Sequence, residues 1–367
     1  MKLVEKVGQY VTVGGFFVGA MDAEGKQYLS NNEFFADAFN YLLYDGEEVI
    51  KPGELKELDT TAIAIPYGNN AKAPVQKYRD LLKIWNAMAD ENAIYILLGA
   101  ELQSQVHYAM PVKNMLYDSI GYSEQVAKIG RANRKAAKAS ASVNADTEQN
   151  GDDRKTDGIA VTPGLNDEDG ELVAENGAIK IKLSSAEFLS GFKKGDKLIP
   201  IITAVIYLGE EPWDGPRSLF DILDVKDDRL YKFLSDYKLN LISPANMDEG
   251  EFDKFKTDLG FAMRLIKHQS DDADKILMES GQRMIDAETA GFLNSAINLD
   301  LEIVEEKGGV NMCKAMEKKE KKDKITGAIE MLRLEGTKDD DIIVRVMKAF
   351  GVTKDYVDSL LTPQKAS

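Results

Sequence analysis

The spacing of apolar residues divides the chain into a front part with strands and a rear part that is helical. An apolar stripe at helical spacing predicts a first helix over residues 31–43, which Asn31 or Asn32 can cap. Pro111 opens a further helix, and the pattern is helical from Asp248 onward. Alternating or continuous apolar runs predict strands over residues 60–65, 78–85, 93–98, 198–208 and 238–242. The mixture of strands and helices in the front part predicts an α/β class.

The same pattern separates four segments. Residues 1–27 contain several glycines and no sustained apolar stripe, so we expect a loose N-terminal extension. Residues 28–245 form the α/β core, residues 246–310 a helical region, and residues 311–367 a helical tail. Within the core, residues 140–180 are rich in Asp, Asn, Gly and Thr, which predicts a disordered acidic insertion. The tail combines a charge run with short helices, over residues 314–324, 325–334, 340–350 and 354–361.

Composition narrows the classes of function. The net charge of −16 argues against broad, nonspecific binding of nucleic acid. Half of this charge lies in residues 140–177, which carry ten acidic side chains and two basic ones, so the rest of the chain could still form a local basic groove. Cys313 is the only cysteine, which excludes an intrachain disulfide and fits a cytoplasmic setting. His107 and His268 are the only histidines, which excludes a His-rich metal site. No apolar run reaches the ~20 residues of a membrane span, so we expect a soluble protein without a membrane partner.

Two predicted strands form a hairpin that brings two acids face to face. The turn is centred between Asp90 and Glu91, so facing residues have numbers that add up to the same total, and Asp80 faces Glu101. Directly opposed residues share one face of the sheet, with Cβ atoms ~5 Å apart. Gln103 follows two residues after Glu101 and lies on the same face. Two carboxylates so placed repel each other, and a bridging cation relieves that repulsion.

Oxygen donors are the ligands that Mg²⁺ prefers, so Asp80 and Glu101 are candidate ligands for Mg²⁺ or Mn²⁺. Glu33 and Asp37 are four residues apart on one face of the first predicted helix, and either could supply a third oxygen ligand. Such a metal polarises a phosphate and lowers the pKa of a bound water, the two tasks of phosphodiester hydrolysis. The alternative is that these acids are solvated, because a slip of the hairpin by one residue separates them to opposite faces.

The order of these features resembles a known group of nucleases. A helix, a strand with Asp, a strand with Glu-x-Gln, a further helix and a buried strand follow one another, as in the PD-(D/E)XK nuclease superfamily. More closely, the chain is similar to the recombination-promoting nuclease and transposase family (YhgA-like). The stretches that carry this resemblance are residues 32–40, 78–83, 99–104, 110–118 and 213–219.

The resemblance implies a restriction-endonuclease-like core over residues 28–245, a mixed sheet flanked by helices, followed by an all-helical C-terminal region. It implies a metal-dependent DNA endonuclease in which Asp80 and Glu101 bind the metal. Glu33 or Asp37 would then match the acidic residue that the superfamily carries on its first helix.

Gln103 departs from the superfamily pattern, because it stands where that pattern has a catalytic lysine. A lysine stabilises developing negative charge, whereas the amide of Gln103 only forms hydrogen bonds. We therefore expect help from Arg79, Lys83 or Lys113, or weak activity.

Contact with DNA requires cations, and the helix that follows Gln103 supplies them. Helical spacing places several of its basic residues along one side, where they could follow phosphates. The alternative is a solvated helix end. These candidate DNA-binding residues are Lys113, Lys128, Arg131, Arg134, Lys135 and Lys138.

Three other functions compete with an active nuclease. A nuclease fold without activity could bind DNA or protein, which Gln103 and the net acidity favour. The helical tail over residues 311–361 could form a homo-oligomer. A hydrolase that uses His107 or His268 ranks last, because no nucleophile motif accompanies either histidine.

Overall fold

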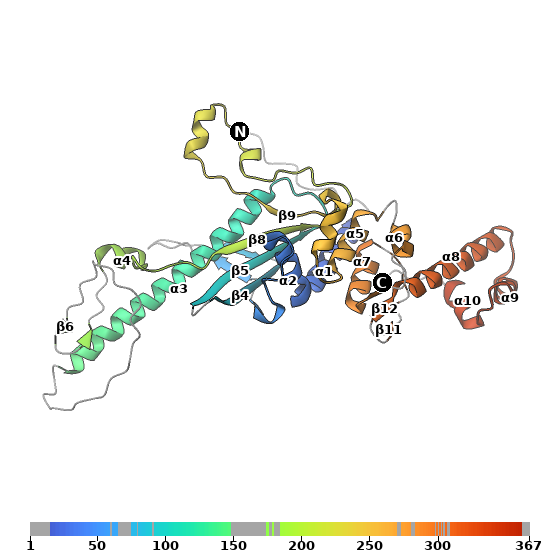
Figure 1. Ribbon diagram of the computed structural model, residues 1–367, viewed down its shortest axis with the longest axis horizontal. Coiled ribbons are helices and arrows are strands. Elements are labelled where there is room, and N and C mark those ends of the chain that lie inside the picture. The colour runs from blue at the N-terminus through green and yellow to red at the C-terminus, as the bar shows by residue number, and fades with distance from the viewer. Residues whose placement is uncertain are drawn as a thin grey trace.

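A five-stranded mixed sheet forms the centre of the molecule (Figure 1). In the order of the sheet its strands are β1 (Leu55–Glu57), β4 (Leu81–Ala89), β5 (Asn92–Gln103), β8 (Ile201–Tyr207) and β9 (Asn240–Ile242). Neighbours β1, β4 and β5 are antiparallel, while β5, β8 and β9 are parallel. The α/β class is therefore confirmed. The computed structural model describes residues 15–58, 61–64, 75–78, 80–89, 92–147, 174–175, 178–179, 184–269, 273–279, 283–297, 299, 301, 303, 305–306 and 309–361.

The hairpin of β4 and β5 has the predicted register. Leu81 faces Ala100 at one end and Ala89 faces Asn92 at the other, so the turn lies where the sequence placed it. The two turn residues themselves are outside the described residues. Continuing the register by one position places Asp80 opposite Glu101. Both strands differ in extent from the prediction, because residues 75–78 form a separate strand and β5 continues to Gln103.

The two faces of β5 have different surroundings. Leu98 and Leu102 lie in the main hydrophobic core, together with residues of β4 and β8. Glu101 and Gln103 alternate with them and lie on the opposite face. The long helix α3 (Met110–Thr147) crosses that face, since its residues contact both β5 and β8 (Figure 1). The core therefore occupies one side of the sheet, and α3 covers the acids on the other.

The first two helices pack on the core side. They are α1 (Gly15–Ser30) and α2 (Asn32–Tyr44), and the side chain of Asn31 caps α2 by accepting from the Glu33 amide. We expected a loose extension over residues 1–27, but residues 15–27 belong to α1, whose end, Tyr28 and Leu29, lies in the core. Gly25 permits this, since a Cβ there would lie 2.7 Å from the Leu102 side chain. Residues 1–14 lie outside the described part.

Residues 246–310 share the hydrophobic core of the central sheet. Their side chains belong to the same core as α2 and β5, including Phe252 near the start of this region and Val310 at its end. It is also not entirely helical, since a small three-stranded sheet lies within it. Its elements are η4 (Pro244–Asn246), η5 (Glu249–Lys254), α5 (Leu259–Lys267), α6 (Ala273–Glu279), β10 (Met284–Ile285), α7 (Ala287–Ile297), β11 (Glu305–Glu306) and β12 (Gly309–Asn311).

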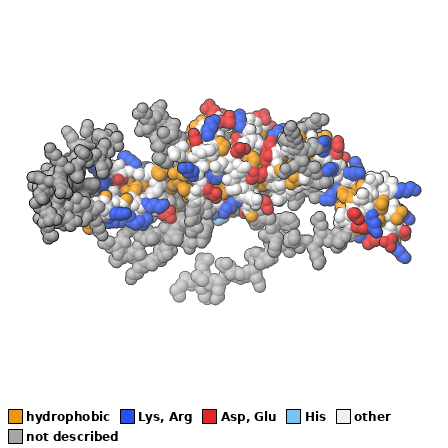
Figure 2. Space-filling model, turned by 90° about the horizontal axis from the view of Figure 1, so that it is seen from below, with side chains coloured by type: hydrophobic (Ala, Val, Ile, Leu, Met, Phe, Trp, Pro, Cys, Tyr) orange, Lys and Arg blue, Asp and Glu red, His pale blue; other side chains and the backbone are white. Residues whose placement is uncertain are grey.

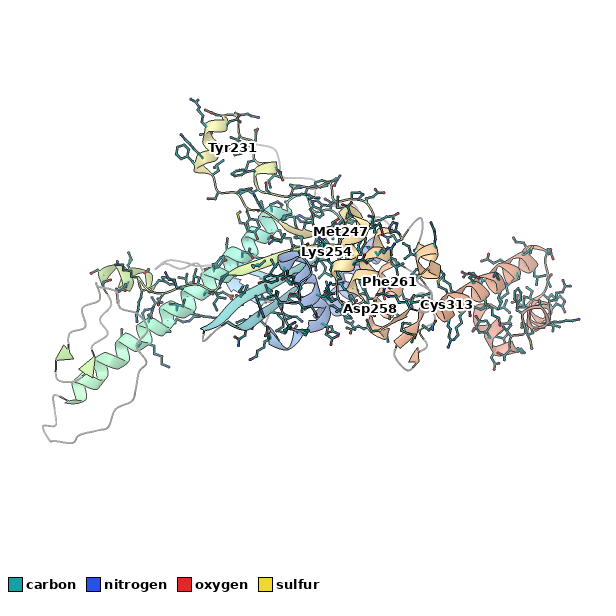
Figure 3. The ribbon with its side chains drawn as sticks, viewed as in Figure 1. Tyr231, Met247, Lys254, Asp258, Phe261 and Cys313 are labelled. Atoms are coloured by element: carbon teal, nitrogen blue, oxygen red, sulfur yellow. The ribbon has the colours of Figure 1, made fainter. Side chains whose placement is uncertain are left out.

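Shorter elements complete the front part. The predicted strand over residues 60–65 is β2, which pairs with β3 outside the central sheet. Helix α3 continues to Thr147, into the predicted insertion, of which residues 148–173 lie outside the described part. The segment over residues 217–239 projects from the body, with Tyr231 near its tip (Figure 3). The bounds are η1 (Pro52–Glu54), β2 (Thr61–Ala64), β3 (Val75–Tyr78), β6 (Ala174–Glu175), β7 (Ala178–Ile179), α4 (Ser185–Ser190), η2 (Phe220–Ile222) and η3 (Asp228–Phe233).

The C-terminal helices extend from the body at the end opposite to the free end of α3 (Figure 1). They are α8 (Met312–Leu334), α9 (Asp339–Phe350) and α10 (Lys354–Leu361). The predicted helices over residues 340–350 and 354–361 are confirmed as α9 and α10. The charge run over residues 314–324 and the predicted helix over residues 325–334 together form the longer α8. A small hydrophobic core of their own holds the three helices together, with Ile325, Ile342 and Val357 fully buried. Among the described helices, none has the length and apolar character needed to cross a lipid bilayer.

Candidate functional site

Three acidic side chains from different elements lie near the C-terminal end of β5. Asp22 comes from α1, Asp80 directly precedes β4, and Glu101 lies within β5. Burial raises the pKa of Asp22 and the negative charge of Asp80 raises it further, while hydrogen bonds from Ser104 and the charge of Lys113 act in the opposite direction. Since such effects require proximity, Asp22 lies near Ser104 and within electrostatic range of Asp80 and Lys113.

Glu101 is the most deeply buried member of the group. Its side chain is 1% exposed, and its Oε2 lies 2.9 Å from the Nζ of Lys113, which is 29% exposed. Lys113 lies in the first turn of α3, so this ion pair joins α3 to β5 across the covered face of the sheet. A buried carboxylate requires such a partner, because an isolated charge is costly away from water.

Asp80 is held by the backbone of the strand that it faces. Its Oδ2 accepts a hydrogen bond of 3.0 Å from the amide of Leu102, the residue after Glu101. This bond crosses the hairpin and fixes the half-buried carboxylate of Asp80 at the end of β5. The predicted neighbourhood of Asp80 and Glu101 therefore has a clear structural basis.

Gln103 lies on the same face as Glu101, as predicted, but its amide forms a local hydrogen bond. Its Nε2 donates to the carbonyl oxygen of Leu102 at 2.5 Å. The side chain is half-buried at the end of β5. In this conformation the amide turns back on the strand and does not contact the acids through any bond that we observe.

Neither Glu33 nor Asp37 joins this group, so the prediction of a third ligand from the helix over residues 31–43 is wrong. Both carboxylate oxygens of Asp37 accept hydrogen bonds from the segment before α5: from the amides of Lys256 and Thr257 and from the Thr257 hydroxyl, at 2.6 to 3.0 Å. Glu33 is exposed and lines a different pocket of about 620 Å³. Asp258, which is labelled in Figure 3, lines the same pocket. The acid from an early helix that interacts electrostatically with Asp80 is Asp22.

Of the three basic residues expected to assist Gln103, the structure brings Lys113 to the acids. Lys83 lies on the opposite, core-facing side of β4, where its Nζ donates to the Ser30 carbonyl at 2.5 Å and to Asn32 Oδ1 at 2.6 Å. Burial lowers the pKa of Lys83, and these two bonds tie β4 to the junction of α1 and α2. Arg79 lies outside the described residues.

The group contains the oxygen ligands that a magnesium site uses, but they do not form a complete coordination shell. One oxygen, Asp22 Oδ1, is buried and forms no hydrogen bond within the described part of the chain. Among the described residues, however, no three His, Cys, Asp or Glu side chains stand together as a ready-made metal-binding group. Asp80 and Glu101 each direct one oxygen at a protein donor instead. The residues fit Mg²⁺ or Mn²⁺ in kind, because all three acids offer oxygen ligands, and their side chains would have to reorient to coordinate one ion.

The predicted basic residues of α3 lie beyond the sheet, on the free half of the helix. Lys128, Arg131 and Lys135 are exposed and lie on one side at helical spacing. Arg134 instead lies against the loop after α4, since a Cβ on Gly191 would lie 2.5 Å from its guanidinium. The side chain of Lys138 lies outside the described part. We call Lys128, Arg131 and Lys135 the basic stripe.

The structure adds further lysines to this surface. Asn133 of α3 donates to the Gly191 carbonyl and to Asp196, which ties the loop after α4 to the free half of the helix. That loop carries Lys194 and Lys197, both exposed. Lys and Arg side chains accordingly gather toward this end of the molecule in Figure 2. Sequence reasoning missed these lysines, because they are about 60 residues from the stripe in the chain.

Asp22 also escaped the sequence reasoning, although a signal for it exists. Asp22, Gly25 and Leu29 are spaced so that they share one face of a helix. Gly25 and Leu29 of that face pack into the core, next to Leu102 in the case of Gly25. Asp22 stands one turn earlier, which brings it to the end of β5.

Comparison of the chain with profiles of known protein families, with curated proteins and with solved structures found no match.

Proposed function

We propose that the chain is a Mg²⁺- or Mn²⁺-dependent DNA endonuclease with a core of the PD-(D/E)XK type, of the recombination-promoting or transposase kind. The observation that carries this proposal is the group formed by Asp22, Asp80, Glu101 and Lys113 at one end of β5. It brings three oxygen-donor side chains and one ammonium to the same end of β5. The fold supports the proposal too, since a mixed sheet flanked by helices places the hairpin acids at the end of its central strand.

The charge of this group favours a divalent cation. Three carboxylates against one ammonium leave an excess of two negative charges when all are ionised. Like charges in a partly buried place repel each other more strongly than they do in water. Asp80, Glu101 and Asp22 would hold the cation, which when bound polarises a phosphate and acidifies a bound water.

The remaining residues of the site have roles that follow from their contacts. The Leu102 amide keeps Asp80 oriented toward the end of β5. Lys113 is partly exposed, so its ammonium can leave Glu101 and bind a phosphate oxygen of the substrate. It thereby supplies the positive charge that the superfamily pattern places at the position of Gln103.

The basic stripe gives DNA a second point of contact. From Lys113 to Lys135 the helix advances by 22 residues, about 33 Å at 1.5 Å per residue. That length is close to one turn of B-form DNA, ~34 Å. We therefore expect a duplex to contact the site at the start of α3 and the basic stripe about one turn away, with Lys194 and Lys197 beside it.

The direct test is a nicking assay on supercoiled and linear DNA with Mg²⁺, Mn²⁺ or chelator. We expect D80A, E101A and D22N to reduce nicking at least tenfold. A half-exposed acid of the projecting segment, changed in D227N, is the matched control and should leave nicking unchanged. Equal nicking by wild type, D80A and E101A would refute the proposal.

A second candidate is a nuclease fold without activity that binds DNA or protein. Two contacts favour it: Lys113 already neutralises Glu101, and the Gln103 amide is turned back on the strand. Calorimetry separates the candidates. Absence of Mg²⁺ and Mn²⁺ binding together with measurable DNA binding would support the inactive form.

We also propose that the helical tail mediates self-association. Its three helices form a core of their own, and they leave Met331, Leu334 and Val344 exposed by 60%, 89% and 64%. Because Met316 of α8 belongs to the main core, the tail has to be cut beyond it. Light scattering should show a smaller assembly after removal of residues 323–367, and an unchanged mass would exclude this role.

A further inference from the structure

Asn114 is a fully buried polar residue beside the candidate site. Its side chain is 0% exposed, and within the described part of the chain neither its Nδ2 nor its Oδ1 forms a hydrogen bond. More than about 90% of buried polar groups in folded proteins have such a partner. An amide that lacks both bonds destabilises the fold, so a leucine, which branches at the same atom, would suit a purely structural position better.

The contacts of α3 show where Asn114 lies. Asp118 accepts a hydrogen bond from Thr203, and a Cβ on Gly121 would contact Ile201, so α3 runs antiparallel to β8. One turn before Asp118, Asn114 comes to the level of Val205. The partner of Val205 in β5 is Glu101, which pairs with Lys113, the neighbour of Asn114 in the chain. Asn114 is therefore buried between α3 and the sheet, at the level of Glu101.

We propose that Asn114 is a positioning residue for Glu101. When the ammonium of Lys113 turns to a phosphate, the buried carboxylate of Glu101 loses its nearest charged partner. The amide of Asn114 can then donate to one carboxylate oxygen and leave the other directed at Asp22 and Asp80. This inference rests on the proposed function, and it explains why an amide is kept where an apolar residue would be more stable.

The test compares stability with metal binding in the full chain. N114L should raise the melting temperature of the metal-free protein by about 2 to 4 °C, because it removes an unsatisfied buried amide. It should also weaken Mn²⁺ binding, measured by titration calorimetry, by about tenfold, a usual effect of removing a group that orients a metal ligand. Should N114L lower the melting temperature, N114A removes the amide without adding volume, and the same loss of Mn²⁺ affinity is expected.

Asn86 provides a matched control. Its Oδ1 is also buried without a hydrogen bond, on the same face of the hairpin, but six residues along β4 from Asp80, about 20 Å away. N86L should raise the melting temperature and leave Mn²⁺ binding unchanged. If N114L and N114A bind Mn²⁺ as tightly as wild type, Asn114 has no positioning role while the proposed function stands. If wild type itself binds no Mn²⁺ and cleaves no DNA, the proposed function falls and the role of Asn114 falls with it.

Discussion

The Nζ of Lys113 lies 2.9 Å from Oε2 of Glu101, whose side chain is almost fully buried beneath α3. This pair joins the first turn of α3 to β5 and neutralises one carboxylate of the candidate site. Under the proposed function, Lys113 would have to leave Glu101 before it could contact a substrate.

Removal of the Lys113 ammonium should destabilise the fold. We expect K113M to lower the free energy of unfolding by about 2 kcal/mol, because it leaves the charge of Glu101 buried without its partner. Urea denaturation measures this change. The double variant K113M/E101Q carries no unpaired charge and should recover most of the loss. A double variant as unstable as K113M would show that the ion pair is not the cause.

The raised pKa of Asp22 predicts a dependence of stability on pH. A carboxyl whose pKa is higher in the folded state than in the unfolded state binds its proton more tightly when folded. Its stabilising effect is therefore present below the unfolded value, 3.8, and is lost as pH rises through the higher folded value. We expect D22N to be more stable than wild type at neutral pH and to lose this advantage in acid. Denaturation of both proteins from pH 3 to pH 8 tests this, and parallel curves would contradict it.

Asp37 should behave as a structural residue. Its carboxylate accepts the amides of Lys256 and Thr257 and the Thr257 hydroxyl, so D37A should lower the free energy of unfolding by about 2 to 3 kcal/mol. The exposed Glu33 is the control, and E33A should change stability by less than about 0.5 kcal/mol. Mn²⁺ affinity should be unchanged in the folded D37A protein. A selective loss of Mn²⁺ binding would restore Asp37 as a ligand.

The basic stripe should govern DNA affinity through salt. The triple variant K128E/R131E/K135E should weaken binding and reduce the slope of log K against log salt by about 0.9 for each phosphate that the protein no longer neutralises. Titration of a fluorescent duplex at several salt concentrations measures both quantities. The same reversal at three exposed lysines of α8, in K318E/K321E/K324E, is the control for net charge. Equal effects of both triple variants would show that the basic stripe does not contact DNA.

Local sequence patterns were sufficient to predict those parts of the structure that depend on neighbouring residues. The register of the β4–β5 hairpin follows from its turn and its alternation of side chains, so Asp80 and Glu101 could be placed opposite each other from the sequence. The cap at Asn31 and the bounds of α10 likewise depend on residues within one or two turns. These elements can be predicted from the local sequence, because the interactions that define them lie within a short stretch of chain.

The rest of the candidate site was decided by tertiary packing. Asp22 and Asp37 are both acids on early helices, but only packing reveals that Asp22 reaches the hairpin while Asp37 binds Thr257, 220 residues away in the chain. Lys83 and Lys113 are both lysines near the hairpin, yet they lie on opposite faces of the sheet. The sequence by itself determined the α/β class and the facing pair Asp80 and Glu101, because turns and periodicity act locally. The tertiary structure decided which third acid and which lysine join that pair, because contacts between distant segments depend on how whole helices pack against the sheet.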